Sequence, residues 1–256
     1  MPKPSLVLLG GQSISSRIMY HALAQDFHVL AVIQENRPSR KTLLQRRVKK
    51  LGLPKVSGQL LFMAYDRLYL HNRQQKKIDE LIERYNLNTQ AFPAAIVKTV
   101  NSVNDPDTIE ALRRHRPDAV VISGTRIISA DVLASISSPF LNIHAGITPR
   151  YRGVHGGYWA LANGDRAHCG VTVHLVDTGI DTGAVLYQTA IDVANDDGFH
   201  TYPIHQIAKA IPLMKQALLD VAANRLQPGI GVGPSQLWSH PTLLEYIRNS
   251  VAAGVR

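Results

Sequence analysis

The sequence predicts an α/β fold: a Rossmann-like, mostly parallel twisted sheet with flanking helices. The chain starts with a short apolar run, a turn at Gly10-Gly11, a helical stretch and a second apolar run. This strand–turn–helix–strand order is typical of a parallel sheet with crossover helices. Short apolar runs recur along the chain, as expected of buried strands. With 256 residues, 45% of them hydrophobic, the chain can bury one sizeable core.

The first half of the chain alternates predicted strands with predicted helices. Asp105-Pro106-Asp107 indicates a helix start, because proline fits the first helical turn and acidic residues favour it. A longer helical segment is interrupted near Gly52-Leu53-Pro54 and near Ser57-Gly58. The predicted strands span residues 5–9, 27–33, 94–100 and 118–122, and the helices span 14–25, 41–85, 105–115 and 129–136.

The second half begins with a predicted strand, 140–144, that leads directly into a glycine-rich loop. A turn is expected at Asn163-Gly164-Asp165, and Pro203 and Pro212 are candidate breaks or kinks in a long helix. The remaining elements are helices at 158–162, 199–224 and 241–249, strands at 170–176 and 184–190, and a loop at 227–234. We expect one main domain over 1–225 with a basic helical insertion at about 41–85. A C-terminal loop and helix extension follows at 226–256, without a separate domain.

Composition excludes several classes of protein. The single cysteine, Cys169, cannot form an internal disulfide, so nothing indicates an oxidising compartment. The sequence has no run of about 20 apolar residues for a transmembrane helix, and its N-terminal apolar stretch is too short for a signal peptide. We expect a soluble, cytoplasmic protein. No metal site is expected, because the spacing of His144, His155, His168 and His174 is not that of a zinc protease.

The net charge of +9 is concentrated in one segment. Between Arg37 and Arg84 the sequence has 13 Lys/Arg against four Asp/Glu, an excess that accounts for the whole net charge. A basic patch attracts phosphates on a nucleotide-bearing metabolite, on nucleic acid or on an anionic membrane. A solvated helical surface explains the pattern equally well. An RNA-binding protein that uses this segment, and a membrane-peripheral enzyme, are therefore alternatives from other functional classes.

The residues most suggestive of chemistry are Asn142 and His144. They are two positions apart at the end of a predicted strand, so their side chains share a face at the edge where open α/β sheets bind ligands. A later glycine-containing loop supplies two carboxylates, Asp177 and Asp181. An amide, an imidazole and a carboxylate suit acyl transfer to an amine. The amide and imidazole can donate to the developing oxyanion, and the imidazole with a carboxylate can move the proton.

Residues 142–188 resemble the formyltransferases that use 10-formyltetrahydrofolate. The shared elements are Asn-x-His, a Pro-x-x-x-Gly loop, a Gly-Val-Thr strand and an Asp-x-Gly loop, in that order. Residues 120–128 are similar, more weakly, to the family's folate-pocket strand and loop. The family includes glycinamide ribonucleotide formyltransferase, methionyl-tRNA formyltransferase and the nucleotide-sugar N-formyltransferases. The resemblance implies a Rossmann-like formyltransferase catalytic domain over 1–225 and 10-formyltetrahydrofolate as the formyl donor.

The resemblance also implies roles for individual residues. Asn142, His144 and Asp181 take the catalytic positions, and Asp181 is preferred to Asp177 because it precedes the turn before the last strand. The implied donor-binding residues are Gly124, Arg126, Ile127, Ile128, Asp177, Thr178 and Gly179. The expected substrate-binding turn, through backbone N–H groups at a helix N-terminus, comprises Gly10, Gly11, Gln12 and Ser13. The chain departs from the family's usual His-x-Ser-Leu-Leu-Pro at Gly146 and Thr148, which leaves the shape of that loop open.

The amine acceptor is less determined than the reaction. The first turn lacks the Gly-Ser-Asn phosphate cradle of the glycinamide ribonucleotide enzymes, which weakens that acceptor. The tRNA-acting relatives have a C-terminal RNA-binding domain, and only 32 residues follow Asn224 in this chain, so nucleic acid is disfavoured as a partner. The basic segment and residues 239–242 look like members linked to amino-sugar chemistry. We expect an amino sugar carried on a nucleotide, with glycinamide ribonucleotide or another metabolite amine as the alternative. A homodimer and a membrane contact stay open.

Overall fold

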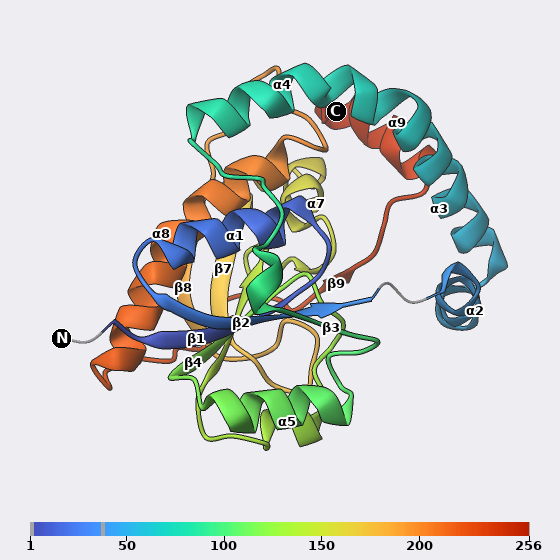
Figure 1. The fold of residues 1–256 in the computed structure, drawn as a ribbon. Coiled ribbons are helices and arrows are strands. Elements are labelled where there is room, and N and C mark those ends of the chain that lie inside the picture. Colours follow the sequence, from blue (N-terminus) through green and yellow to red (C-terminus); the bar gives the residue numbers. More distant parts are fainter. Residues whose placement is uncertain (1–2, 37–38, 256) are drawn as a thin grey trace.

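The computed structural model describes residues 3–36 and 39–255, which are built around one seven-stranded sheet (Figure 1). Its strands are β1 (Ser5–Gly10), β2 (His28–Glu35), β3 (Val97–Val100), β4 (Ala119–Ser123), β5 (Phe140–His144), β7 (Gly170–Leu175) and β8 (Val185–Ala190). They lie in the order β3-β2-β1-β4-β5-β7-β8. The pairs from β3 to β5 are parallel, whereas β7 runs antiparallel to both β5 and β8. The predicted α/β class with a mostly parallel sheet is confirmed.

Helices cover both faces of this sheet (Figure 1). On one face lie α1 (Ile14–Ala24) and α8 (Tyr202–Ala222), and on the other lie α5 (Pro106–His115) and α6 (Ala130–Leu133). Side chains alternate along a strand, so β1 places Leu6 and Leu8 against the first pair of helices and Val7 and Leu9 against the second. All four are fully buried. This burial on both faces is why the strand is continuously apolar in the sequence.

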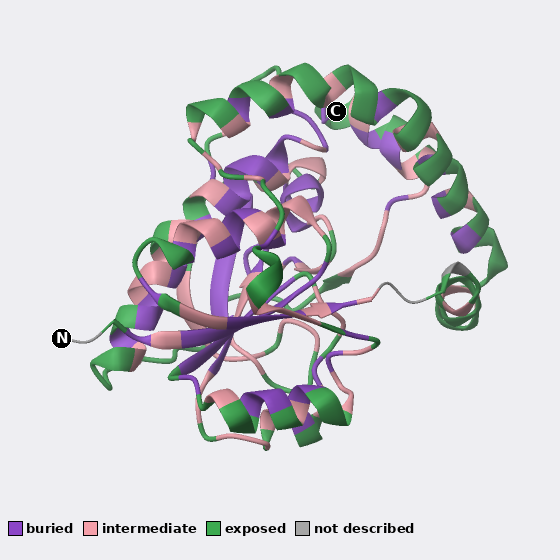
Figure 2. Cartoon of the chain, viewed as in Figure 1, coloured by how far each residue is buried: buried purple, intermediate pink, exposed green. Residues whose placement is uncertain are grey.

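Residues 40–84 form a series of helices, which we call the arm, that arches over one end of the molecule (Figure 1). The arm comprises α2 (Arg40–Leu51), α3 (Leu53–Tyr65), a π-helical turn (Asp66–Leu70) and α4 (His71–Arg84). The C-terminal helix α9 (Leu243–Ala253) packs along α3, where the ring of Tyr246 lies 5.1 Å from that of Phe62 and 5.9 Å from that of Tyr65. The outer surface of the arm is exposed, and none of the described side chains of α2 is buried (Figure 2).

Shorter elements connect the loop after β5 to the C-terminal segment. A separate two-stranded sheet pairs β6 (Arg152–Gly153) with β9 (Leu237–Trp238), and α7 (Gly156–Ala162) precedes β7. Turns of 3-10 helix lie at Ala94–Ile96 and Arg166–His168. The β6–β9 pair holds the C-terminal segment against the loop that follows β5. Within residues 3–36 and 39–255, no helix has both the length and the apolar content needed to span a bilayer.

The structure corrects three expectations about individual elements. The predicted break at Ser57-Gly58 is absent, because α3 continues through Gly58. A Cβ there would come within 2.9 Å of Thr242, so this glycine serves close packing against α9 rather than a turn. Helix α8 is continuous through Pro212, and Pro203 lies in its first turn, where its missing N–H costs nothing. The predicted strand 94–100 is shorter, since residues 94–96 form a 3-10 turn before β3.

Candidate active site

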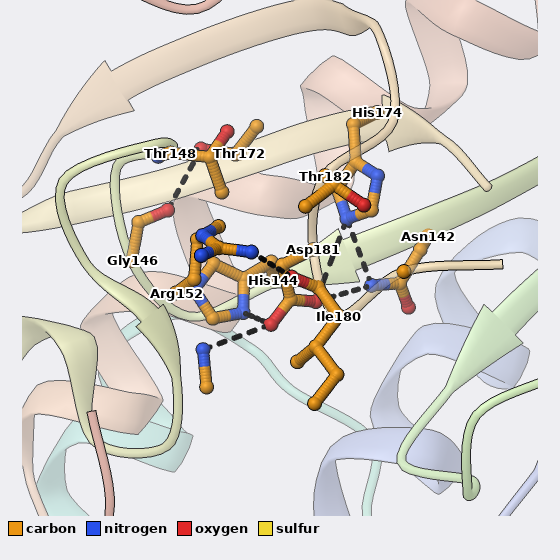
Figure 3. Close-up of polar contacts among 12 residues, drawn as sticks. Asn142, His144, Gly146, Thr148, Arg152, Thr172, His174, Ile180, Asp181 and Thr182 are labelled. Carbon is orange, nitrogen blue, oxygen red and sulfur yellow. Dashed lines mark hydrogen bonds and ion pairs between the residues drawn. The ribbon is translucent and has the colours of Figure 1, made fainter. Parts of the chain in front are cut away.

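Strand β5 and the loop after β7 bring the predicted catalytic side chains together. Asn142 and His144 come from the end of β5, two positions apart and on one face. The loop between β7 and β8 returns across them and carries Asp181, whose φ of +50° is a left-handed conformation that residues other than glycine seldom adopt. Figure 3 shows the three side chains converging from these separate segments.

Asp181 lies at the centre of the hydrogen bonds in this cluster (Figure 3). Its Oδ2 accepts a hydrogen bond from the backbone N–H of Gly153 at 2.9 Å and lies 3.3 Å from Nδ1 of His144. Its Oδ1 accepts from the amide of Asn142 at 3.4 Å. Burial raises the pKa of the Asp181 carboxyl, but His144 and the Gly153 N–H favour the charged form, so the pKa lies below its ordinary value. Asp181 is therefore held as a carboxylate.

His144 is a buried imidazole with an acceptor at each ring nitrogen. Nε2 donates to the backbone carbonyl of Tyr151 at 2.6 Å, because a carbonyl oxygen can only accept. Nδ1 faces the Asp181 carboxylate, and a proton held between the two groups makes this contact a hydrogen bond. Burial lowers the pKa of His144 more than Asp181 and the Tyr151 carbonyl raise it. A proton on Nδ1 is therefore readily given up, as proton transfer requires.

His174 on β7 is a fourth member of the cluster, directly opposite Asn142 in the β5–β7 pair. Its Nδ1 donates to the carbonyl of Leu175 at 2.7 Å, which leaves Nε2 to accept from the Asn142 amide at 3.0 Å. Both amide hydrogens of Asn142 are thus engaged, one by His174 and one by Asp181. The contact with Asp181 is the longer, so a ligand oxygen can replace it at the smaller cost. From the sequence, His174 is considered only as a metal ligand and set aside, because its place beside Asn142 arises from strand pairing.

Gly146, in the loop after β5, lets the backbone reach the His144 ring. A Cβ at this position would lie 2.4 Å from the Tyr151 carbonyl oxygen and 2.7 Å from Nε2 of His144. Any side chain would therefore push into the hydrogen bond that orients His144. Thr172 fixes the same loop, since its Oγ1 donates to the Gly146 carbonyl at 2.7 Å and accepts from the Thr148 N–H at 3.1 Å. Glycine in place of the family's usual serine thus has a local physical reason.

The cluster opens into a cavity of about 980 Å³. Its inner walls are the loop after β4 and the loop after β7, and its outer wall is formed by α2, α3 and the segment around β9. Six of the seven residues expected to bind the donor line it, namely Gly124, Arg126, Ile127, Ile128, Asp177 and Gly179, whereas Thr178 does not. Glu35 anchors the loop after β4, because its carboxylate pairs with the Arg126 guanidinium and accepts a hydrogen bond from the Arg126 backbone N–H at 3.2 Å.

The first strand–helix turn is not brought to the cavity. The backbone N–H of Gly11 donates to the Ser123 carbonyl at 3.1 Å, and Ser13 caps α1 by accepting from the Ser16 N–H at 3.2 Å. Gly10, Gly11, Gln12 and Ser13 are all absent from the cavity lining, although Ser15 in the following turn belongs to it. The structure thus gives this turn a role in joining α1 to the sheet, and the expected substrate contacts there stay a prediction without geometric support.

The outer wall contains residues outside the set expected from the sequence. Arg47 and Lys50 come from α2, and Lys55 comes from α3. His155 and His240, which are 85 positions apart in the chain, join their rings through a 2.9 Å Nε2–Nδ1 hydrogen bond. Burial lowers the pKa of His155 to about 3 and that of His240 to about 4, so both rings are neutral at neutral pH. Across the described ranges, no three His, Cys, Asp or Glu side chains are grouped to hold a metal ion.

Comparison with known proteins matches residues 31–210, more than half of the chain, to the family described as formyl transferase. A curated methionyl-tRNA formyltransferase from Anaeromyxobacter dehalogenans (strain 2CP-1 / ATCC BAA-258) is 36% identical over 127 residues, which cover 49% of this chain but only 40% of that relative. A sugar N-formyltransferase from Shewanella sp FDAARGOS_354 has a similar fold, with a TM-score of 0.56 at 15% identity over 91% of this chain and 76% of that one. HypX from Aquifex aeolicus, in complex with tetrahydrofolic acid, gives 0.55 at 15% identity over 93% of this chain and 29% of that one.

Proposed function

The chain belongs to the formyl transferase family, and from this premise we propose that it transfers a formyl group from 10-formyltetrahydrofolate to the primary amine of a small-molecule acceptor. One observation carries the proposal. An amide, an imidazole and a carboxylate, from Asn142, His144 and Asp181, converge at the inner end of a cavity whose size is at the upper end of the range for small-molecule sites. Together they can meet the two requirements of acyl transfer to an amine, which are stabilising the oxyanion and moving the proton of the attacking amine.

The inner half of the cavity fits the donor. Ile122, Ile128 and Val176 give it apolar walls, which suit a flat heteroaromatic ring. Residues of the loop at 124–128, together with Asp177 and Gly179, line the edge of this space. When bound, 10-formyltetrahydrofolate supplies a formyl carbonyl joined to a nitrogen leaving group.

The side chains of this site then have separate roles in the reaction. Asn142 donates an amide hydrogen to the formyl oxygen, where negative charge develops, by giving up its 3.4 Å contact with Asp181. His174 keeps that amide in place from the neighbouring strand. His144, backed by the Asp181 carboxylate, takes the proton from the attacking amine and returns it to the departing nitrogen. The acceptor amine is itself the nucleophile, so no serine or cysteine is required.

The acceptor is an amino sugar carried on a nucleotide. In support, the cavity extends from the catalytic cluster to the arm, which leaves room for more than a bare amine. Glycinamide ribonucleotide, or another metabolite amine, is the alternative small acceptor. Methionyl-tRNA belongs in the same comparison, because the curated relative is named a methionyl-tRNA formyltransferase.

An assay of the purified chain tests this proposal. The chain is supplied with 10-formyltetrahydrofolate and with each acceptor class in turn, and release of tetrahydrofolate is followed with time. We expect turnover with an amino sugar carried on a nucleotide. Asn142→Ala, His144→Ala and Asp181→Ala are each expected to lower the rate by about 100-fold or more, with circular dichroism unchanged. Wild-type rates in all three variants contradict the assigned roles, and an absence of turnover with every amine contradicts the activity.

A further inference from the structure

The side of the cavity opposite the catalytic cluster is a wall of positive charge. Arg47, Lys50 and Lys55 line it, and the ion pairs found among the described residues include none of the three. Some other cations of the chain are neutralised, as Lys77 is by Asp196. The acidic side chains in the cavity lining are Asp177 and Asp181, which lie at the catalytic end. The cavity is therefore acidic at one end and basic at the other.

Arg47 is the cation best placed to bind a ligand. Burial is the main cause of the lowered pKa of His155 and of His240, and the positive charge of Arg47 contributes to both. The Arg47 guanidinium therefore lies near that neutral pair. Its side-chain hydrogen bond, within the described part of the chain, is to the thioether sulfur of Met63 at 3.6 Å, which is a weak acceptor. Most of its five N–H donors therefore remain available for an anion, and their fork geometry suits a phosphate.

Gln59 supplies a second, independent indication of a ligand. Its side chain is 1% exposed and lines the cavity next to the basic wall. Nε2 donates to the carbonyl of His240 at 2.7 Å, whereas Oε1 is buried and has no hydrogen-bond partner among the described residues. A buried acceptor without a donor is unfavourable. A hydroxyl or amine group of a ligand at this position would satisfy it.

We propose that this wall is a binding site for the phosphate or diphosphate group of the acceptor, held by Arg47, Lys50 and Lys55, with Gln59 accepting a hydrogen bond from a sugar hydroxyl beside it. The identity of this ligand as the acceptor rests on the proposed function, whereas the anion site is defined by the cavity and its charges alone. The cations of the basic segment noted in the sequence thereby fall into two groups. A few of its cations contact the ligand, and the rest contribute a long-range field that attracts it.

Titration calorimetry with inorganic pyrophosphate, at about 150 mM ionic strength so that distant charges are screened, tests the anion site directly. The variant Arg47→Ala/Lys50→Ala/Lys55→Ala is expected to weaken pyrophosphate binding by about tenfold or more, since charge-assisted hydrogen bonds are lost. The matched control, Arg67→Ala/Arg73→Ala/Lys76→Ala, removes the same charge from the same arm at positions outside the cavity lining. We expect the control to bind pyrophosphate within about twofold of the wild type, because long-range charge is screened.

Gln59 is tested with two probes. Gln59→Leu is expected to weaken binding of glucosamine 1-phosphate several-fold while leaving pyrophosphate binding unchanged, because only the first probe has hydroxyls. Unchanged pyrophosphate binding also shows that the variant is folded. Equal loss of both probes would overturn the assignment of Gln59.

Three results overturn the anion site: no pyrophosphate binding by the wild type, equal loss in the control and cavity variants, or binding only to phosphatidylglycerol vesicles or to RNA. Binding of 5-formyltetrahydrofolate, measured in parallel, separates this site from the proposed function. Pyrophosphate binding without folate binding contradicts the formyl transfer but supports the site. Folate binding without pyrophosphate binding contradicts the site but supports the donor pocket.

Discussion

Two carboxylates of one loop, four positions apart, have different surroundings. Asp181 faces His144 and Asn142, whereas Asp177 accepts from the Thr182 hydroxyl at 2.7 Å and from the Gly179 N–H at 3.0 Å within its own loop. The first arrangement can move a proton, and the second shapes the loop that lines the half of the cavity proposed to bind the donor. Sequence spacing alone gives both residues the same appearance.

This difference predicts different kinetic effects. Asp181→Asn is expected to lower kcat by about 100-fold or more, because an amide cannot hold the proton shared with His144. Asp177→Asn is expected to raise the KM for the donor more than it lowers kcat. Steady-state kinetics with both substrates varied measure the two effects, and Asp192→Asn, whose side chain is fully exposed, is the control. A larger kcat loss for Asp177→Asn than for Asp181→Asn contradicts the assignment.

Gly146 gives a second prediction at the residue scale. Gly146→Ala places a methyl group against the Tyr151 carbonyl and the His144 ring, so we expect a kcat loss of about tenfold or more and a loss of about 1–3 kcal/mol in unfolding free energy. Gly164→Ala is the matched control. It has a φ of +71° with open space around it, so it loses about 1–2 kcal/mol through backbone strain without any loss of rate. Equal rates for both variants would show that Gly146 does not position His144.

His155 and His240 predict how stability depends on pH. Their folded pKa values, about 3 and about 4, are below the ordinary 6.5. Between pH 6.5 and 4 the unfolded chain therefore binds more protons, so the free energy of unfolding falls as the pH falls, by up to about 1 kcal/mol per pH unit for each ring. Urea unfolding at pH 7, 6 and 5 measures this slope. His155→Gln/His240→Gln should have a shallower slope, and a double variant with the wild-type slope refutes the two rings as its source.

At the scale of the element, the arm is held by contacts of α3 with α9 and of α4 with α8 rather than by its own helices. Gly58 lets α3 approach Thr242, and Phe62 packs its ring against Tyr246. The described part of α2 buries no side chain and contacts mainly α3. A short helix of this kind is marginal in water by itself, so the position of the basic wall depends on how α3 docks.

A substitution at the contact between α3 and α9 tests how the arm depends on this docking. Gly58→Ala adds about 1 kcal/mol of helix propensity but introduces a contact under 3.0 Å with Thr242, which costs about 1–3 kcal/mol. We expect a net loss of unfolding free energy in urea, and Thr242→Ser, which removes the nearby methyl group but keeps the helix cap, should restore part of it. A Gly58→Ala variant more stable than the wild type would show that α9 can move away freely.

At the scale of the whole molecule, charge is distributed unevenly. The net charge of +9 arises in the segment that contains the arm, and the cavity is lined both by residues of the arm and by loops at the carboxyl ends of the parallel strands. Anionic ligands are therefore attracted toward the open side of the cavity. The proposed reacting groups, Asn142, His144 and Asp181, lie at the opposite end, on and beside the central sheet.

This distribution predicts a salt effect on the acceptor. Between about 50 and 300 mM ionic strength, kcat/KM for a phosphate-bearing amine should fall several-fold, because the screening length drops below about 10 Å. The corresponding amine without phosphate should change little. Initial rates at low acceptor concentration give both values, and equal salt dependence of the two amines would exclude attraction of the phosphate by the arm.

The sequence by itself determined the class of the fold and predicted Asn142 and His144 as one pair, whereas the choice of Asp181 as their partner came from the resemblance to the family. Apolar runs broken by glycine specify buried parallel strands, and Asn142 and His144 share a face because side chains alternate along a strand. Such local patterns act over a few residues, so they can be read without knowing the fold. The same locality explains the errors, since Gly58 looks like a helix break when only its neighbours in sequence are considered.

The tertiary structure decided which distant groups meet. His174 joins Asn142 only through strand pairing, His155 meets His240 across 85 positions, and the cations of the arm face the cavity only because α3 docks on α9. The fold also gives the first turn local contacts, since the Gly11 N–H bonds to the end of β4 and Ser13 caps α1. Long-range contacts depend on the packing of whole elements, whose energy is summed over many side chains. No short stretch of sequence contains that information.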